Sequence, residues 1–210
     1  AGKIAIRLSW RDETKNDQAL EQAAFGDGGS VQFFQGDDPP FFGMGAKGEP
    51  VNVWSWKASW EADLAGYRDI HDAHPGMAVD YYQSLQDPPK GRHSPPGEFP
   101  TDQHDPTFLT GWGAGNVVSH PKRTSSVEDL NAQGFGTLHN QGKGAQSVAG
   151  RGRWENGAWS VVFVRDLPAS DAGDIFFRSG DTLSVAFAVW DGAAGDRNGQ
   201  KAVSIWHRLS

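Results

Sequence analysis

The apolar residues of this chain occur in short runs that alternate with polar ones, and this period of two restricts the fold most. In "KIAIRLSW", Ile4, Ile6 and Leu8 lie on one side of the alternation. The stretches "VNVWSWKASW", "DTLSVAFAVWDG" and "KAVSIWHRL" show a similar pattern. Because successive side chains of a β-strand point to opposite faces, such alternation predicts strands that are buried on one side.

Turn signals separate these runs. Asn156-Gly157, between two strand-like stretches, is typical of a two-residue type I′ hairpin turn. The polar stretch "DETKNDQALEQAA" predicts either a short helix or an excursion, and the proline-rich "QDPPKGRHSPPGEFPTDQHDP" predicts an extended surface loop. We therefore expect an all-β fold, with one β-sandwich domain over residues 1–210, long loops and a few short helices.

Composition excludes several function classes. The 210 residues contain no cysteine, which excludes disulfides, thiolate catalysis, iron–sulfur ligation and thioether-linked haem. A formal net charge of −7, with no basic patch, argues against nucleic acid and anionic lipid as partners. The apolar runs have strand length, so no membrane span is expected.

Motifs for catalysis are missing, and no catalytic residue is predicted. The sequence contains no GxSxG, HExxH or GxGxxG pattern. Glu128 and Asp129, which follow "RTSSV", are interpreted as the first turn of a capped helix rather than as an acid–base pair. The stretch "DIHDAH" offers a weak metal-site hypothesis, and a solvated polar loop is the favoured interpretation.

Tryptophan, glycine and methionine carry the more specific signal. Nine tryptophans fit a sandwich core, and some of them could line a slot for a planar ligand or a sugar ring. Both methionines lie in glycine-containing segments, Met77 in "HPGMAVDYYQ" and Met44 in "FFGMGAKG". Each could be a packing residue or a thioether ligand of a non-covalent haem, and the residues alone favour packing.

Several stretches together resemble one family. They are "FFGMGAKGEPVNVWSWKASW", "PGMAVDYY", "GAGNVVSHPKRTSSVEDLNAQGFGTL", "RGRWENGAWSVVFVRDL" and "DTLSVAFAVWDGAAGDRNGQKAVSIWHRL". In this order they are similar to the haem-b-binding γ subunits of type II enzymes of the dimethyl sulfoxide reductase family, such as ethylbenzene dehydrogenase, dimethylsulfide dehydrogenase and the selenate and chlorate reductases. The similarity covers about residues 41–209.

The resemblance implies a single non-covalent haem b held between the loops of the sandwich, with methionine and lysine as axial ligands. On this chain it favours Met77 and Lys143, with Met44 and His139 in reserve. Arg151 in "AGRGRW" is expected to pair with a haem propionate, because arginine matches carboxylate geometry. Trp54 and Trp56 are expected to line the cofactor.

The implied function is electron transfer within a periplasmic complex. The resemblance implies an iron–sulfur β subunit and a molybdenum α subunit as partners, which hold the iron–sulfur clusters and the Mo-bis-MGD cofactor. Electrons would pass between the β subunit and an external carrier such as cytochrome c. A tryptophan-rich carbohydrate-binding β-sandwich module is the alternative, in which exposed aromatic rings would stack on sugars.

Overall fold

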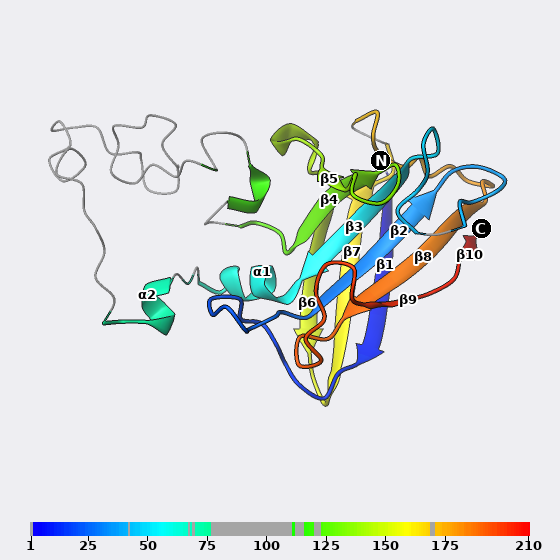
Figure 1. The fold of residues 1–210 in the computed structure, drawn as a ribbon. Helices are drawn as coiled ribbons and strands as arrows, with labels where there is room; N and C mark the ends of the chain where they lie inside the picture. The colour runs from blue at the N-terminus through cyan, green and yellow to red at the C-terminus, as the bar shows by residue number, and fades with distance from the viewer. Residues whose placement is uncertain are drawn as a thin grey trace, which may run out of the picture.

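The computed structural model describes residues 2–41, 43–66, 68, 70–76, 111, 116–119, 123–168 and 171–210. In this part of the chain, two antiparallel β-sheets pack face to face (Figure 1). The expected all-β sandwich is confirmed, and its long connections lie at the ends of the sheets.

The smaller sheet has three strands in the order β1-β7-β6, namely β1 (Lys3–Arg11), β6 (Ala149–Trp154) and β7 (Ala158–Asp166). Asn156 and Gly157 join β6 to β7, with φ angles of 52° and 71°. Both angles are positive, as a type I′ turn requires, so the predicted hairpin is confirmed. Strand β1 alternates exposed and half-buried residues along its whole length, which confirms the pattern in "KIAIRLSW".

The larger sheet has seven strands in the order β10-β8-β2-β3-β4-β5, with β9 also paired to β8. These strands are β2 (Gly28–Phe34), β3 (Val51–Lys57), β4 (Val127–Ala132), β5 (His139–Asn140), β8 (Leu183–Trp190), β9 (Ala202–Val203) and β10 (His207–Leu209). Strands β2, β3 and β8 lie side by side at the front of Figure 1.

Helical structure is short in the described residues. It includes α1 (Ala58–Asp63), α2 (Ile70–Ala73) and the 3₁₀ turns η1 (Val117–Ser119) and η2 (Lys143–Ala145). The stretch "DETKNDQALEQAA" forms an irregular excursion between β1 and β2, which is one of its two predicted forms. Among these helices, none is long and apolar enough to cross a membrane.

The main core lies between the two sheets. It is built from alternate side chains of both sheets, including Val31, Phe33, Trp54, Trp56, Val127, Trp159, Val161 and Phe163. Ile4, Ile6, Leu8 and Trp10 of β1 pack against it. Removal of this apolar surface from water is the main stabilising term of such a fold.

One local prediction is wrong. Glu128 and Asp129 do not begin a helix, because they belong to strand β4 and are 4% and 0% exposed. Strand β4 pairs along its whole length with β3, and the Glu128 carboxylate forms an ion pair with Lys57. The tertiary pairing with β3 overrides the local Ser-x-x-Glu capping signal.

Candidate cofactor site

The face of the seven-stranded sheet that points away from the smaller sheet, here called the outer face, carries the candidate site. A side chain added at Gly29 would meet Trp10 of β1, so Gly29 faces the other sheet. Since neighbours on a strand alternate, the next residues face outward. The outer face is formed by Gly28, Ser30, Gln32 and Phe34 of β2, Val51, Val53, Ser55 and Lys57 of β3, Glu128, Leu130 and Ala132 of β4, and Ser184, Ala186, Ala188 and Trp190 of β8.

Met44 packs against one end of this face. It contacts a buried cluster formed by Phe34, Val51, Val53, Leu130 and Ala132. Its backbone has a φ of 84°, an uncommon value for a residue with a side chain. Two hydrogen bonds hold it there: its N–H donates to Gln32 Oε1 at 3.0 Å, and its carbonyl accepts from the Gly134 N–H at 2.7 Å. The loop therefore fixes the thioether beside the sheet at a cost in backbone energy.

Lys201 lies over the other end of the same face. Strand β9 pairs with β8 so that Val203 is opposite Ala188, and this register places Lys201 opposite Trp190. Its Nζ is 5.2 Å from the centre of the Trp190 ring and donates to the Asn198 carbonyl at 3.2 Å. Burial lowers the pKa of Lys201. A lowered pKa favours the neutral amine, which is the form that can bind a metal.

Lys57 also lies on the outer face, and its pKa can be compared with that of Lys201. Burial also lowers the pKa of Lys57, while the neighbouring Glu128 carboxylate raises it. The ion pair with Glu128 keeps the Lys57 ammonium occupied, whereas burial is the cause of the shift at Lys201. Lys201 is thus the better candidate for a neutral ligating amine. Sequence reasoning did not single it out, although it lies within "GQKAVSIW", one of the motifs on which the family resemblance depends.

The centre of the outer face is lined with small side chains. Ser30 Oγ donates to Ser55 Oγ at 2.9 Å, and Ala186 and Ala188 follow on the neighbouring strand. Ser30 and Ala186 are 4% and 8% exposed, so this part of the face is shielded from solvent. Small side chains project only a short way from the sheet, and shielding is what a low-polarity haem environment requires.

The side-chain amide of Gln32, on the outer face of β2, is only partly hydrogen-bonded. Its Oε1 accepts the Met44 N–H, but its Nε2 is buried and has no hydrogen-bond partner in the structure. A buried N–H donor without an acceptor is costly, so such groups commonly mark the place of a ligand. The Met44 thioether, the Lys201 amine and Gln32 Nε2 are therefore a donor set whose chemistry suits a haem with its carboxylates.

Of the ligand pair preferred from the sequence, only Lys143 lies among the described residues. Met77 lies outside the described residues. Lys143 is exposed in η2, and His139 is exposed in β5 with its Nδ1 2.9 Å from the Thr137 carbonyl oxygen. The roles of Met77, Lys143 and His139 as iron ligands stay predictions.

Trp54 and Trp56 belong to the layer between the sheets, and neither is exposed. The Trp54 indole donates to Asn52 Oδ1 at 2.9 Å, and its ring centre lies 4.7 Å from that of Phe33. The Trp56 ring centre lies 4.6 Å from that of Trp159. Both rings are enclosed by other core side chains, and their expected contact with a cofactor stays a prediction.

Arg151 lies on β6 with 64% of its side chain exposed, and its Nη1 is 3.8 Å from Glu61 Oε1. Glu61 Oε2 also accepts the Gly152 N–H at 2.7 Å and the Trp56 indole N–H at 3.0 Å. Arg151 therefore already has a carboxylate nearby. Its expected pairing with a haem propionate stays a prediction.

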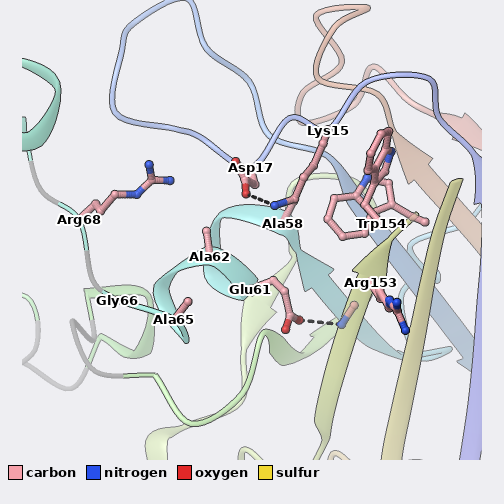
Figure 2. Close-up of a pocket in the computed structure, with 12 residues that line it drawn as sticks. Lys15, Asp17, Ala58, Glu61, Ala62, Ala65, Gly66, Arg68, Arg153 and Trp154 are labelled. Atoms are coloured by element: carbon pink, nitrogen blue, oxygen red, sulfur yellow. Dashed lines mark hydrogen bonds and ion pairs between the residues drawn. The ribbon is translucent and has the colours of Figure 1, made fainter. Parts of the chain in front are cut away.

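A pocket lies at the edge of the sandwich (Figure 2). It is an open pocket of about 650 Å³, lined by Lys15, Asp17, Ala58, Glu61, Ala62, Ala65, Gly66, Arg68, Gly152, Arg153, Trp154 and Trp159. Lys15 Nζ forms an ion pair with Asp17 at 2.7 Å. Its lining includes neither methionine nor histidine, and its lysine is paired, so this pocket fits a haem iron less well than the outer face does.

The fold and the outer face together define a class: a β-sandwich that carries a thioether and a desolvated amine on one shielded sheet face. The comparison with known families identifies the family. The chain belongs to the ethylbenzene dehydrogenase family, whose model matches residues 1–202. The family expected from the sequence motifs is thus confirmed.

Three relatives are similar to this chain. A Haloferax mediterranei protein, provisionally named a respiratory nitrate reductase heme subunit, is 24% identical over 99% of this chain and 51% of its own length. The chlorate reductase subunit gamma of Ideonella dechloratans is 24% identical over 100% of this chain and 60% of its own. The dimethylsulfide dehydrogenase subunit gamma of Rhodovulum sulfidophilum is 31% identical over 51% of this chain and 43% of its own. The chain thus spans about half to three fifths of the first two relatives.

Proposed function

We propose that this chain binds one haem b without a covalent bond and transfers electrons as the haem subunit of a molybdenum oxidoreductase complex. The names of the relatives support the coarse part of the proposal, since one is called a heme subunit and two are called gamma subunits of a reductase and a dehydrogenase. Non-covalent binding follows from composition, because a chain of 210 residues without cysteine offers no thioether linkage to haem.

Met44 and Lys201 are the residues that we propose as iron ligands. A haem held by them would supply a one-electron iron couple. The Met44 thioether favours ferrous iron, and the Lys201 amine ligates without adding charge once it has lost its proton. Gln32 Nε2 is oriented by the Met44 backbone and would donate to a haem carboxylate. Met77 with Lys143 is the competing assignment.

The observation that carries this proposal is the position of Lys201. An amine whose pKa is lowered by burial faces the same shielded sheet surface as a thioether held on a strained loop. A lysine that served solubility alone would extend into solvent and keep its charge. The desolvation cost at Lys201 is offset if the amine donates its lone pair to a metal.

The finer parts of the proposal concern partners and location. We propose an iron–sulfur β subunit and a molybdenum α subunit as partners, an external carrier such as cytochrome c, and a periplasmic location. The net charge of −7 supports attraction of a basic carrier protein. Native size-exclusion chromatography tests the assembly: the chain should elute in a larger complex, and elution only as a single 22.7 kDa protein would contradict it.

The cofactor itself is tested by titration of the purified protein with haemin. We expect a Soret band that saturates at one haem per chain, a pyridine haemochrome of the b type, and complete extraction of the pigment by acid–acetone. Pigment that stays with the polypeptide, or no saturable band at all, would contradict the proposal.

The carbohydrate-binding alternative has less support from the structure. Such modules need aromatic rings at the surface, on which sugars stack. Eight of the nine tryptophans lie among the described residues, and none of these eight is an exposed large hydrophobic residue. Trp112 is outside the described residues.

A further inference from the structure

Three carboxylates gather at one end of the sandwich, far from the pair Met44 and Gln32 along the strands. Asp12 directly follows β1, Asp27 directly precedes β2, and Asp191 directly follows β8. One oxygen of each carboxylate lies within 4.8 Å of the others. The Asp12 N–H donates to the Gly157 carbonyl, so the cluster lies beside the β6–β7 turn, at the lower end of the view in Figure 1.

Asp12 has an oxygen without a partner. The residue is 6% exposed, and its Oδ1 accepts from the Thr14 N–H at 3.2 Å. Its Oδ2 is fully buried and accepts no hydrogen bond in the structure. A buried carboxylate oxygen with no donor is costly, because nothing replaces the water that it has lost.

Asp27 is held rigidly beside it. This residue is 2% exposed. Its Oδ1 accepts the Gly192 N–H at 2.9 Å, and its Oδ2 accepts the Asn16 N–H at 2.7 Å and the Trp159 indole N–H at 2.9 Å. Hydrogen bonds of this kind orient a carboxylate in the way that the outer partners of metal ligands usually do.

No cation among the described residues balances this charge. None of the ion pairs in the described part of the chain includes Asp12, Asp27 or Asp191. Burial, together with the neighbouring carboxylates, raises the pKa of Asp12, and burial raises the pKa of Asp27. Among the described residues, the three carboxylates thus receive hydrogen bonds but have no positively charged side chain paired with them.

We propose that Asp12, Asp27 and Asp191 bind one Ca²⁺ ion, with the unpartnered Oδ2 of Asp12 as one ligand. Carboxylate oxygens without histidine or cysteine are a ligand set for hard cations. Two oxygens on opposite sides of a calcium ion lie about 4.8 Å apart, given Ca–O bonds of about 2.4 Å. Three carboxylate oxygens within 4.8 Å of one another can therefore share one ion. The partly exposed Asp191 leaves access for the ion and for water ligands.

The ion would act as a link between the two sheets. Asp12 extends from β1 of the three-stranded sheet, whereas Asp27 and Asp191 extend from adjacent strands of the seven-stranded sheet. Binding to the folded state alone stabilises it by mass action. None of these three carboxylates is a proposed iron ligand, and they lie at the opposite sheet end from Met44, although Asp191 directly follows Trp190, over which Lys201 lies.

The test uses the whole purified protein after treatment with a chelator. We expect millimolar Ca²⁺ to raise Tm in a saturable way, with one ion bound per chain by calorimetry and with an unchanged Soret band in protein that carries haem. Asp12→Asn should lower the calcium affinity by more than about tenfold, since loss even of an outer partner of a ligand has about that effect. The exposed Asp37→Asn is the matched control and should respond like the wild type.

Three outcomes would overturn the proposal. The first is an unchanged Tm in calcium, and the second is an equal calcium response in Asp12→Asn and wild-type protein. The third is an equal shift with Mg²⁺, which would show a general ionic effect rather than a calcium site. If Asp12→Asn does not fold, Asp191→Asn at the more accessible position gives the same comparison.

Discussion

The two faces of the seven-stranded sheet are formed by the same strands but carry different kinds of side chain. The inner face carries large side chains such as Trp54 and Phe33, which fill the space between the sheets, and the Trp54 indole N–H donates to Asn52 Oδ1. The outer face carries Ser30, Ser55 and Ala188, with Met44 and Lys201 at its two ends. On the inner face, the protein's own side chains fill the space between the sheets. The other face carries a thioether, a partly buried amine and an unpartnered amide donor.

This difference shows which signals distinguish a core from a site. Abundant tryptophan indicates a core when the rings contact one another and their N–H groups are satisfied, as for Trp54 and Trp56. A buried group without a hydrogen-bond partner, such as Gln32 Nε2, and an amine whose pKa burial lowers, such as that of Lys201, indicate a binding surface.

The largest expected effect tests the inner face. Trp54→Ala should lower the free energy of unfolding by about 3–5 kcal/mol, because it leaves a cavity in a packed aromatic layer. Trp190→Ala on the outer face, where the ring is only half-buried, should cost clearly less. Urea unfolding of both variants measures this. Equal losses, or loss of haem from Trp54→Ala without loss of stability, would remove the distinction between the faces.

The next largest effect is the pH dependence of stability that Asp129, on the inner face of β4, should cause. Burial raises the pKa of Asp129 to about 7, although Asn52 and Ser147 donate hydrogen bonds to it. The folded protein therefore holds the Asp129 proton more tightly than the unfolded chain does. Its contribution to stability is present at low pH and is lost as pH rises from about 4 to about 7, by an amount on the order of a few kcal/mol.

Asp129→Asn removes this titration while keeping the shape of the side chain. As pH rises across that interval, the wild type should lose the contribution of Asp129 and the variant should not. The unfolding free energy of the variant should therefore increase relative to that of the wild type. Chemical unfolding at a series of pH values measures it. A constant difference across the interval would show that Asp129 is ionised in the folded protein at all these pH values.

A smaller effect on stability is expected when a larger side chain is introduced on the outer face. Ala188→Leu should change the free energy of unfolding by about 1 kcal/mol or less, because Ala188 is only half-buried. It should nevertheless lower haem content strongly, since the new side chain occupies the space above the sheet. Ala202→Leu, at an exposed position of β9, is the control and should keep its haem. Normal haem in Ala188→Leu would place the cofactor elsewhere.

The smallest effect is expected at Arg151. Its side chain is exposed and lies 3.8 Å from Glu61, and exposed ion pairs of this kind contribute about 0–1 kcal/mol. Arg151→Ala should therefore leave both Tm and haem content almost unchanged if the outer face holds the cofactor. A fall in haem affinity would instead support the propionate pairing that the sequence suggested.

Local patterns predicted the fold well and the site only in part. The alternation in β1 and the Asn156-Gly157 turn are properties of short stretches, so both could be read from the sequence. Glu128 was misinterpreted because its environment is created by Lys57, which is distant in the chain.

Lys201 was missed for the same reason. Its flanking residues resemble an ordinary polar loop, and its special character arises only when β9 pairs with β8 and buries the amine over Trp190. The Asp12, Asp27 and Asp191 cluster is also a product of topology, since it joins three strand ends that are far apart in sequence.

The measurement that tests the central claim most directly is the absorption and EPR spectrum of the haem-loaded protein and its ligand variants. We predict a low-spin spectrum in the wild type, conversion to high spin in Lys201→Ala and in Met44→Ala, and an unchanged spectrum in Lys143→Ala. Low-spin spectra in Lys201→Ala and Met44→Ala, together with high-spin spectra in Lys143→Ala and Met77→Ala, would contradict the assignment of the outer face as the haem site.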